Sequence, residues 1–324
     1  MRSHTYLVGA QHRYETFGNT FKTTMFDVTL FNTIEPKNIK TVLSDCFKDY
    51  SIGERRKDAF RPLLEDGIFN SDGTIWAHSR KLIRPTLVIS REMQIAVFAK
   101  HVDNLIRAVP RDGKVVDLQK LFFELTLDTA SDILFGRSCS LLTKPVDNLE
   151  ATAFAEAFSS VQSTLVTHLC LGKLAKIVPE PVFKSHLHYL HTFVDKVIHD
   201  HRQSLEDPTK LPTEARHILQ SLDEEIHDPV KLRGQLMSLL VGGRDTTASL
   251  LSNLWFVLAR RPDIWAKLQL EVGQLNGQKP DCHLLKGMKY LRYCLNECEQ
   301  LTRSINPKIL TKVQQLSAFI LQFQ

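Results

Sequence analysis

One long helical stretch constrains the fold of this chain more than any other feature of its sequence. It begins at Asp228-Pro229, where the aspartate can accept the free amides of a helix N-terminus and proline suits the first helical residue. The helical pattern persists to Arg260-Arg261-Pro262. About thirty residues at 1.5 Å each make a helix of roughly 50 Å. A helix this long and this apolar is expected to run through the middle of the fold.

Most of the remaining sequence also predicts helices, because apolar residues recur at helical spacing. We expect helices at 38–43 (with Pro36 in the first turn), 76–83, 92–109, 118–135, 154–171, 181–205, 262–272 and 289–297. Pro85 is expected to stop the helix 76–83, and the polar residues 207–214 are expected to form a surface loop. Two stretches rich in Thr, Phe and Val, 20–26 and 27–33, predict strands. The fold class is therefore mainly α, with a small N-terminal β-sheet and a long central helix.

Composition excludes several classes of function. With 43% hydrophobic and 24% charged residues, the chain has the make-up of a folded globular protein. The chain has 41 basic and 36 acidic residues, and the basic ones form no dense block, so nucleic-acid binding is not favoured. No stretch approaches the ~18 apolar residues of a membrane span, and the N-terminus does not resemble a signal peptide. The chain is expected to be cytoplasmic or membrane-peripheral.

The hexapeptide 242–247, Gly-Gly-Arg-Asp-Thr-Thr, interrupts the apolar pattern of the long helix. Each glycine costs about 1 kcal/mol relative to alanine in a helix interior. The residues that share one face are Leu239, Gly243, Thr246 and Leu250. That face is hollowed at Gly243, so a flat group could lie against it beside a hydroxyl and a carboxylate able to pass protons. Taken alone, the hexapeptide is equally compatible with a break between two helices, with Asp245 capping the second.

A second cluster lies earlier in the chain. Trp76, Arg80 and Arg84 share a helix face through i,i+4 spacing. An indole N–H beside a guanidinium is suited to hold a carboxylate. The alternative, which the cluster alone favours, is a solvated basic face with Trp76 in the core.

In this order and separation, the two clusters resemble the cytochrome P450 family. Trp76-x-x-x-Arg80 matches the family's WxxxR helix, whose members bind heme propionates. Residues 242–247 match the (A/G)Gx(D/E)TT pattern of the long helix lying over the heme, and 285–297 looks like the helix that follows. The sequences of residues 66–85 and 244–248 are most similar to those of the fungal alkane and fatty-acid hydroxylases.

The resemblance implies a heme-thiolate monooxygenase that hydroxylates an apolar substrate, with electrons from NADPH-cytochrome P450 reductase at the endoplasmic reticulum membrane. It assigns cofactor binding to Trp76, Arg80, Gly242, Gly243 and Thr247, proton delivery to Asp245 and Thr246, and substrate contact to Phe69 and Leu239.

The likeness ends after Glu297, where Gln300 takes the place of the arginine in the family's Glu-x-x-Arg pattern. None of the six cysteines lies in the family's Phe-x-x-Gly-x-x-x-Cys-x-Gly loop; Cys139, within Phe-Gly-Arg-Ser-Cys-Ser, has only a superficial likeness. We therefore predict a partial cytochrome P450 domain at 1–297, a tail without family likeness at 298–324, and no axial cysteine. The alternative function is a non-catalytic, truncated fragment of the family.

The cysteines and histidines are also candidate metal ligands. No CxxC pair is present, so neither a disulfide framework nor a structural zinc site is expected, and a reducing compartment fits best. Histidines cluster at 186–201, and Glu224-x-x-His227 has di-metal spacing. A di-iron bundle needs two such pairs and further carboxylates, so surface histidines are favoured.

Overall fold

The computed structural model describes residues 6–25, 28–89, 91–143, 149–206 and 218–304. The chain divides into two compact units, which are treated separately below. The first comprises Met1–Ile52 with Gln300–Gln324, and the second comprises Gly53–Glu299.

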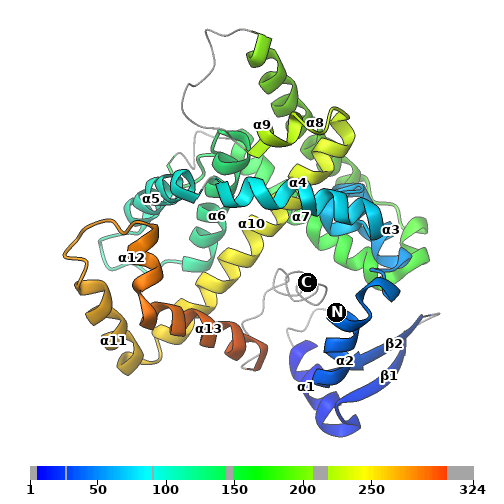
Figure 1. Cartoon of the computed structure of the whole chain (residues 1–324), viewed down its shortest axis with the longest axis horizontal. Helices are drawn as coiled ribbons and strands as arrows, with labels where there is room; N and C mark the ends of the chain where they lie inside the picture. The colour runs from blue at the N-terminus through cyan, green and yellow to red at the C-terminus, as the bar shows by residue number, and fades with distance from the viewer. Residues whose placement is uncertain (1–5, 26–27, 90, 144–148, 207–217, 305–324) are drawn as a thin grey trace. The chain divides into compact units, whose positions relative to one another are not determined.

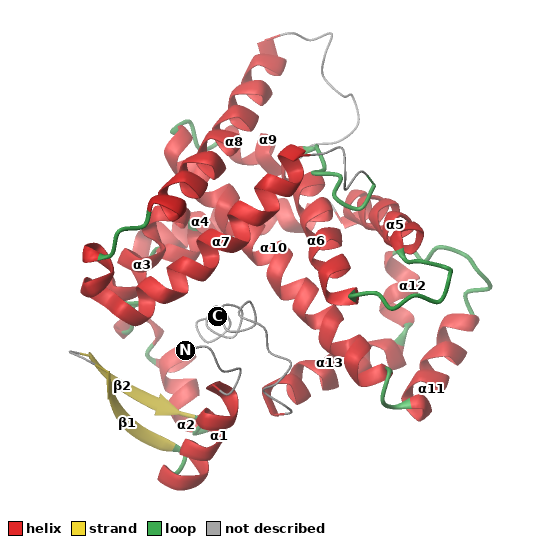
Figure 2. Ribbon diagram, turned by 180° about the vertical axis from the view of Figure 1, so that it is seen from behind, coloured by secondary structure: helices red, strands yellow, loops and turns green. Residues whose placement is uncertain are grey.

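The first unit contains a helix and a hairpin. Helix α1, Tyr6–Phe17, precedes strands β1, Thr20–Met25, and β2, Val28–Thr33. The two strands pair antiparallel with Thr20 opposite Thr33, as the yellow arrows in Figure 2 show. A short helix α2, Pro36–Lys40, continues into a π-helical turn at 41–45 and a 3₁₀ turn at 47–49. Both predicted strands are confirmed within the described residues, whereas α1 was not predicted.

All regular elements among the described residues of the second unit are helices (Figure 1). Its α-helices are α3 Glu54–Leu64, α4 Gly73–Ile89, α5 Arg91–Ala108, α6 Leu118–Phe135, α7 Leu149–Leu171, α8 Pro181–Glu206, α9 Ile218–Asp223, α10 Pro229–Leu258, α11 Pro262–Gly273, α12 Cys282–Gly287 and α13 Lys289–Ser304, the last ending beyond the unit. Two 3₁₀ helices lie at 68–70 and 172–177. The mainly α prediction is confirmed, with α3, α9 and α12 added to the predicted set.

Helix α10 forms the axis of the second unit. Asp228 caps its first turn by accepting hydrogen bonds from the amides of Val230, at 2.9 Å, and Lys231. Its 30 residues run beside α6 (Figures 1 and 2), and its side chains Leu232, Leu236 and others in this stretch are fully buried. The helix continues through Gly242-Gly243 without interruption, so the alternative of two helices with Asp245 as a cap is wrong.

Pro85 does not stop α4, which continues to Ile89, and the prediction of an end there is wrong. Proline removes one amide donor, which leaves the carbonyl four residues earlier without its helical partner. That residue, Lys81, is exposed, so water can solvate its carbonyl. The Thr86 hydroxyl also donates to the Ile83 carbonyl at 2.7 Å, which satisfies another acceptor at this turn. The predicted surface loop 207–214 lies outside the described residues.

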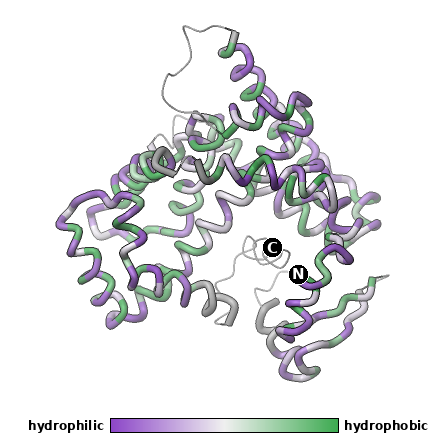
Figure 3. The backbone as a smooth tube through the Cα atoms, viewed as in Figure 1, coloured by the Kyte–Doolittle hydropathy of each residue, from purple (hydrophilic) through white to green (hydrophobic). Residues whose placement is uncertain are grey.

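Hydrophobic and hydrophilic residues alternate along the helices, as an amphipathic bundle requires (Figure 3). One core cluster joins α6 to α10 and the loop after α6 through the buried side chains Phe122, Leu125, Leu142 and Ala248. A second joins α10 to α11 and α13 through Leu254, Leu258, Leu268 and Cys298. Both clusters hold the part of α10 that follows its glycine pair.

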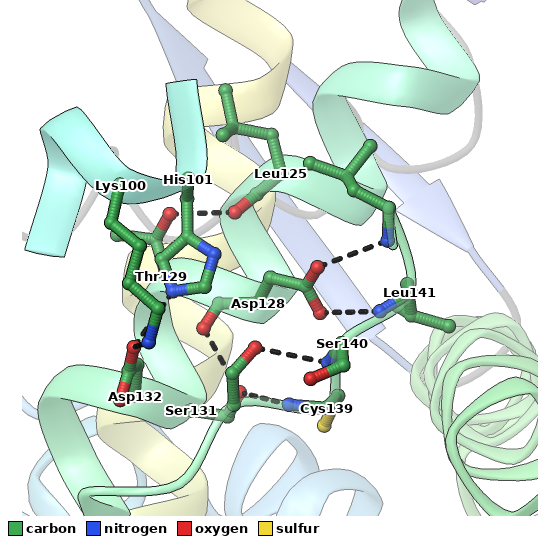
Figure 4. A network of polar contacts seen from close by, with 12 residues as sticks. Lys100, His101, Leu125, Asp128, Thr129, Ser131, Asp132, Cys139, Ser140 and Leu141 are labelled. Atoms are coloured by element: carbon green, nitrogen blue, oxygen red, sulfur yellow. Dashed lines mark hydrogen bonds and ion pairs between the residues drawn. The ribbon is translucent and has the colours of Figure 1, made fainter. Parts of the chain in front are cut away.

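A polar network fixes the loop that leaves α6 (Figure 4). Asp128, fully buried in α6, accepts hydrogen bonds from the amides of Leu141 at 2.8 Å and Leu142 at 3.1 Å. Burial raises the pKa of Asp128, and these two amides oppose the rise. The carboxylate therefore satisfies two backbone amides of the loop, as a neighbouring strand would in a sheet.

The same network joins α5 to α6 (Figure 4). The buried ring of His101 lies with Nε2 2.8 Å from Asp132 Oδ2, and Lys100 Nζ is 2.8 Å from the same oxygen. The hydrogen bond from His101, followed by Lys100, lowers the pKa of Asp132 to about 2. These contacts hold α5 against α6.

Candidate functional site

One face of α10 is left uncovered at the hexapeptide. Gly243 is exposed in the middle of the helix, and its neighbours along that face, Leu239, Thr246 and Leu250, are half-buried. The opposite face is buried, at Arg244, Asp245, Ala248 and Ser249 among others. A Cβ added at Gly243 would contact only Ala130, at 3.4 Å. The face predicted from helical spacing is therefore present, and we refer to Leu239, Gly243, Thr246 and Leu250 as the open face.

The Thr246 hydroxyl is oriented along this face. Its Oγ1 donates a hydrogen bond of 2.6 Å to the carbonyl oxygen of Gly242, one turn earlier. Such a bond back to the preceding turn fixes the rotamer of a threonine. The hydroxyl oxygen keeps its lone pairs available as an acceptor beside the hollow at Gly243. Thr247, the next residue, is half-buried.

The loop between α3 and α4 presses on the glycines of α10. A Cβ at Gly67 would clash with the Gly234 carbonyl and the Ser238 hydroxyl, so the loop backbone touches the helix backbone. One helical turn after Ser238, a Cβ at Gly242 would lie 3.2 Å from the ring of Phe69. Glycines at both contacts let the loop lie this close.

Phe69 is held in place by polar contacts on either side. Its carbonyl accepts a hydrogen bond from Arg56 Nη2 at 3.1 Å. The preceding amide, of Ile68, donates to Gln235 Oε1 at 3.0 Å. The structure thus brings Phe69 to the hexapeptide, while Leu239 lies on the open face one turn before Gly243.

Trp76 and Arg80 lie together on α4. The guanidinium of Arg80 is 5.4 Å from the centre of the indole ring, within the range of a cation–π contact. Arg80 is exposed, and in the described part of the chain its guanidinium makes no ion pair. A cation with free donors beside an indole N–H can hold a carboxylate of a bound group.

Gln235 ties these parts together. Its Nε2 donates to the Ser79 hydroxyl of α4 at 2.8 Å, while its Oε1 accepts from Ile68. One buried amide therefore joins α10, the loop before α4, and the turn of α4 between Trp76 and Arg80. The sequence contains a signal for this residue, since Gln235 is a polar residue next to the apolar Leu236 and Met237, but the spacing of motifs does not detect it.

Asp245 faces away from the open face. It is 1% exposed, and each carboxylate oxygen has a partner. Oδ2 accepts from Gln162 Nε2 of α7 at 2.5 Å, and Oδ1 accepts from Arg244 Nη1 at 3.2 Å. Burial raises the pKa of Asp245, and the guanidinium of Arg244 and the amide of Gln162 oppose the rise. Like Gln235, Gln162 is a polar residue in an apolar helix that the motifs did not single out.

The described cysteines are free thiols. Cys139 is buried, and burial raises the pKa of its thiol to about 11, which is the opposite of what a thiolate ligand requires. In the described residues, no group of three His, Cys, Asp or Glu side chains could hold a metal ion. Burial lowers the pKa of His191 to about 4.

Comparisons with known proteins agree with this geometry. The cytochrome P450 family model matches residues 2–302. The cytochrome P450 monooxygenase himC of Aspergillus japonicus is 36% identical over 309 residues, which cover 93% of this chain and 55% of that protein. Cytochrome P450 52A5 of Candida maltosa is 35% identical over 90% of this chain and 59% of its own. The chain therefore belongs to the cytochrome P450 family.

The fold agrees as well. A crystal structure of the cytochrome P450DA heme domain superposes with a TM-score of 0.75 at 19% identity, over 91% of this chain and 65% of that one. The chain spans about half the length of the curated relatives it matches, between 54% and 60% for the first eight. None of the helices that the structure describes has the length and apolar character to cross a membrane. The domain boundary at residue 297 stays a prediction.

Proposed function

We propose that the protein to which this chain contributes is a heme-thiolate monooxygenase that inserts one oxygen atom of dioxygen into an apolar small molecule. Family membership supports this reaction class, because the cofactor of the family is heme. The observation on which the proposal rests is the open face of α10, where an exposed glycine stands beside a hydroxyl whose rotamer is fixed. A helix that is buried on its other side leaves this strip free for a flat group.

The residues present fit a porphyrin with carboxylate side arms. Arg80 and the indole of Trp76 would hold propionates, because the guanidinium is exposed and has no ion pair among the described residues. Gly242, Gly243 and Thr247 would border the ring along α10. When bound, heme supplies the activation of dioxygen. Thr246 would accept a hydrogen bond from a polar ligand at the open face, since its own proton is donated to Gly242.

The substrate is proposed to be apolar, of the alkane or fatty-acid type. Phe69 lies against Gly242 of the hexapeptide, and Leu239 lies on α10 one turn before Gly243. Neither side chain offers a polar group to a substrate. The sequence resemblance of residues 66–85 and 244–248 to the fungal alkane and fatty-acid hydroxylases supports the same class of substrate. Electrons would come from NADPH-cytochrome P450 reductase, and the whole protein would act at the endoplasmic reticulum membrane.

Heme binding tests the first part of the proposal. The 324-residue chain is titrated with heme, and binding is followed by absorbance and by quenching of tryptophan fluorescence. Arg80→Leu should weaken binding about 10- to 100-fold, since one charge-assisted hydrogen bond contributes about 1.5 to 3 kcal/mol. Trp76→Phe should weaken it less, because only the indole donor is lost. Lys81→Leu, which removes the neighbouring exposed cation of the same helix, should bind heme as wild type does.

The second part is tested in the full-length protein. Reduction under carbon monoxide should give the red-shifted Soret band of thiolate-ligated heme, and an apolar substrate should then be hydroxylated. Heme binding that is equally affected by Lys81→Leu and Arg80→Leu would contradict the assigned carboxylate contacts. A full-length protein that binds heme without the shifted band would contradict the thiolate monooxygenase itself.

A further inference from the structure

The side-chain amide of Gln235 has one possible orientation. The Ile68 amide is a donor, so the atom 3.0 Å from it is the Gln235 oxygen, and the Gln235 nitrogen lies 2.8 Å from the Ser79 hydroxyl. That hydroxyl donates its own proton to the Ile75 carbonyl at 3.0 Å and therefore accepts from Gln235. A side chain at this position needs one donor and one acceptor to serve both neighbours.

The loop that carries Phe69 has little freedom apart from this contact. The backbone of Gly67 already touches that of Gly234, so the loop cannot move closer to α10. Asn70 Nδ2 donates to the Glu65 carbonyl at 2.8 Å, which closes the loop on itself. A movement of the loop is therefore directed away from α10 and breaks its hydrogen bond to that helix.

The other partner of Gln235 lies inside the turn of α4 that carries the proposed carboxylate contacts. Ser79 is 3% exposed and stands between Trp76 and Arg80 in the sequence. Gln235 is itself 5% exposed, so water does not compete for its two hydrogen bonds. The loop with Phe69 and this turn of α4 therefore share one buried anchor on α10.

We propose that Gln235 is a positioning residue that sets the place of Phe69 relative to the turn of α4 at Trp76 and Arg80, and thereby selects which carbon of an extended apolar substrate is hydroxylated. This inference rests on the proposed function, in which that turn holds the cofactor and Phe69 contacts the substrate. A displacement of Phe69 by about 1.5 Å, the length of one carbon–carbon bond, is enough to bring a neighbouring carbon to the reacting position.

The chemistry of such a substrate leaves the choice of carbon to the wall of the site. Hydroxylation replaces one C–H bond with C–OH, and the second oxygen atom of dioxygen leaves as water with two electrons from the reductase and two protons. An extended chain of CH2 groups offers many C–H bonds of similar strength. The position of the wall relative to the cofactor therefore decides which bond reacts.

Hydrogen–deuterium exchange of the 324-residue chain, measured at the Ile68 amide by NMR, tests the anchor without heme. Gln235→Met keeps the length of the side chain and removes the acceptor, so exchange should become about tenfold faster. Gln235→Glu keeps an acceptor for Ile68, and in its protonated form it also donates to Ser79. It should therefore restore the protection of the Ile68 amide to within about threefold of wild type.

Ser79→Ala tests whether α4 belongs to the anchor, since it leaves Gln235 and Ile68 in place. The Gln235 nitrogen then lacks its acceptor and the side chain is less constrained, so the Ile68 amide should exchange about threefold faster. Ser238→Ala is the matched control. Its hydroxyl is buried beside the same loop at Gly67, and it has no hydrogen-bond partner in the described part of the chain, so its loss should leave the exchange rate unchanged.

In the full-length protein the position of hydroxylation is measured with a straight-chain fatty acid. Gln235→Met should lower the share of the main product about twofold in favour of neighbouring carbons, and should raise KM about threefold with little change in kcat. A side chain that only stabilises the fold would reduce the amount of active enzyme and leave the product distribution as it is. Gln235→Glu should restore the wild-type distribution, and Ser238→Ala should not alter it.

Two results would overturn the inference. One is an Ile68 exchange rate that Gln235→Met does not change, and the other is a constant product distribution despite faster exchange. If Gln235→Met does not fold, Ser79→Ala decides by the same two measurements, because it changes an exchange partner and not the helix that carries Gln235. A full-length protein that hydroxylates no substrate contradicts the proposed function, while the exchange rates still decide whether Gln235 holds the loop to α4.

Discussion

Two buried carboxylates, Asp128 of α6 and Asp245 of α10, are satisfied in different ways. Asp128 accepts two backbone amides of the loop after α6, and neither donor can leave without moving the chain itself (Figure 4). Among the described residues, the donors to Asp245 are two side chains, Gln162 and Arg244. Side chains change rotamer on a far shorter timescale than packed backbone rearranges. The donors to Asp128 are therefore fixed by the backbone, whereas the donors to Asp245 are side chains that can change rotamer.

The two carboxylates also differ in the charges beside them. Both groups are withdrawn from water, and burial raises the pKa of both. Only Asp245 has a buried cation beside it, so only there does the balance of charge depend on one neighbour. Removal of that cation should therefore change the protonation of Asp245.

The largest effect should follow removal of Asp128. Asp128→Ala leaves the buried amides of Leu141 and Leu142 without acceptors, which should lower the free energy of unfolding by about 4 kcal/mol. Urea unfolding followed by circular dichroism measures the loss. Asp128→Asn, which keeps one acceptor oxygen, should lose about half as much. A loss below about 1 kcal/mol for the alanine variant would mean that water or a rearranged loop satisfies these amides.

Breaking the second pair should cost less, because the remaining partner can change its charge. Arg244→Met should lower the free energy of unfolding by about 3 kcal/mol, the low end of the range for one half of a buried ion pair, since Asp245 can take up a proton. The double variant Arg244→Met/Asp245→Asn should recover at least about 1 kcal/mol of this loss. Additive losses in the double-mutant cycle would show that the two side chains are not coupled.

The smallest effect concerns acid stability at Asp132, the neighbour of Asp128 one turn along α6. Its pKa is lowered to about 2 in the folded chain, against about 3.9 in the unfolded chain, so its contribution is complete above about pH 4 and is lost as pH falls toward 2. Lys100 is largely exposed and therefore screened, so the contribution should be about 1 to 2 kcal/mol.

Urea unfolding of wild type and Asp132→Asn between pH 5 and 2 measures this contribution, as a difference in the free energy of unfolding of about 1 to 2 kcal/mol at pH 5. Asp132→Asn should be less stable than wild type at pH 5, and the difference should vanish near pH 2. A difference that persists at pH 2 would assign the effect of the variant to packing rather than to charge.

The sequence was enough to predict the fold where a local pattern decides it. Asp228-Pro229 predicts the start of α10, and α6 begins at Leu118 and ends at Phe135 as expected, with Gly136 in the left-handed conformation after it. The prediction failed at Pro85, where solvent exposure and a threonine hydroxyl compensate for the missing donor. Local propensity contains no information about either compensation.

The site was predictable to the extent that it follows helical geometry. The open face at Leu239, Gly243 and Thr246 follows from the 3.6-residue period, and so does the Trp76–Arg80 contact. The direction of Asp245 could not be predicted, because it depends on a partner 83 residues earlier in the chain. Long-range polar contacts of this kind are set by the packing of helices and leave no periodic trace.

The contact between the loop at Gly67 and the glycines of α10 also bears on how the protein folds during synthesis. Ile68 and its partner Gln235 are 167 residues apart in the chain. At about 5–20 residues per second, the ribosome needs roughly 10 to 30 s to make the helix after the loop has emerged. During this interval Phe69 and the loop at Gly67 lack their contacts with α10, so this part of a newly made chain is open to aggregation and to chaperone binding until α10 is complete.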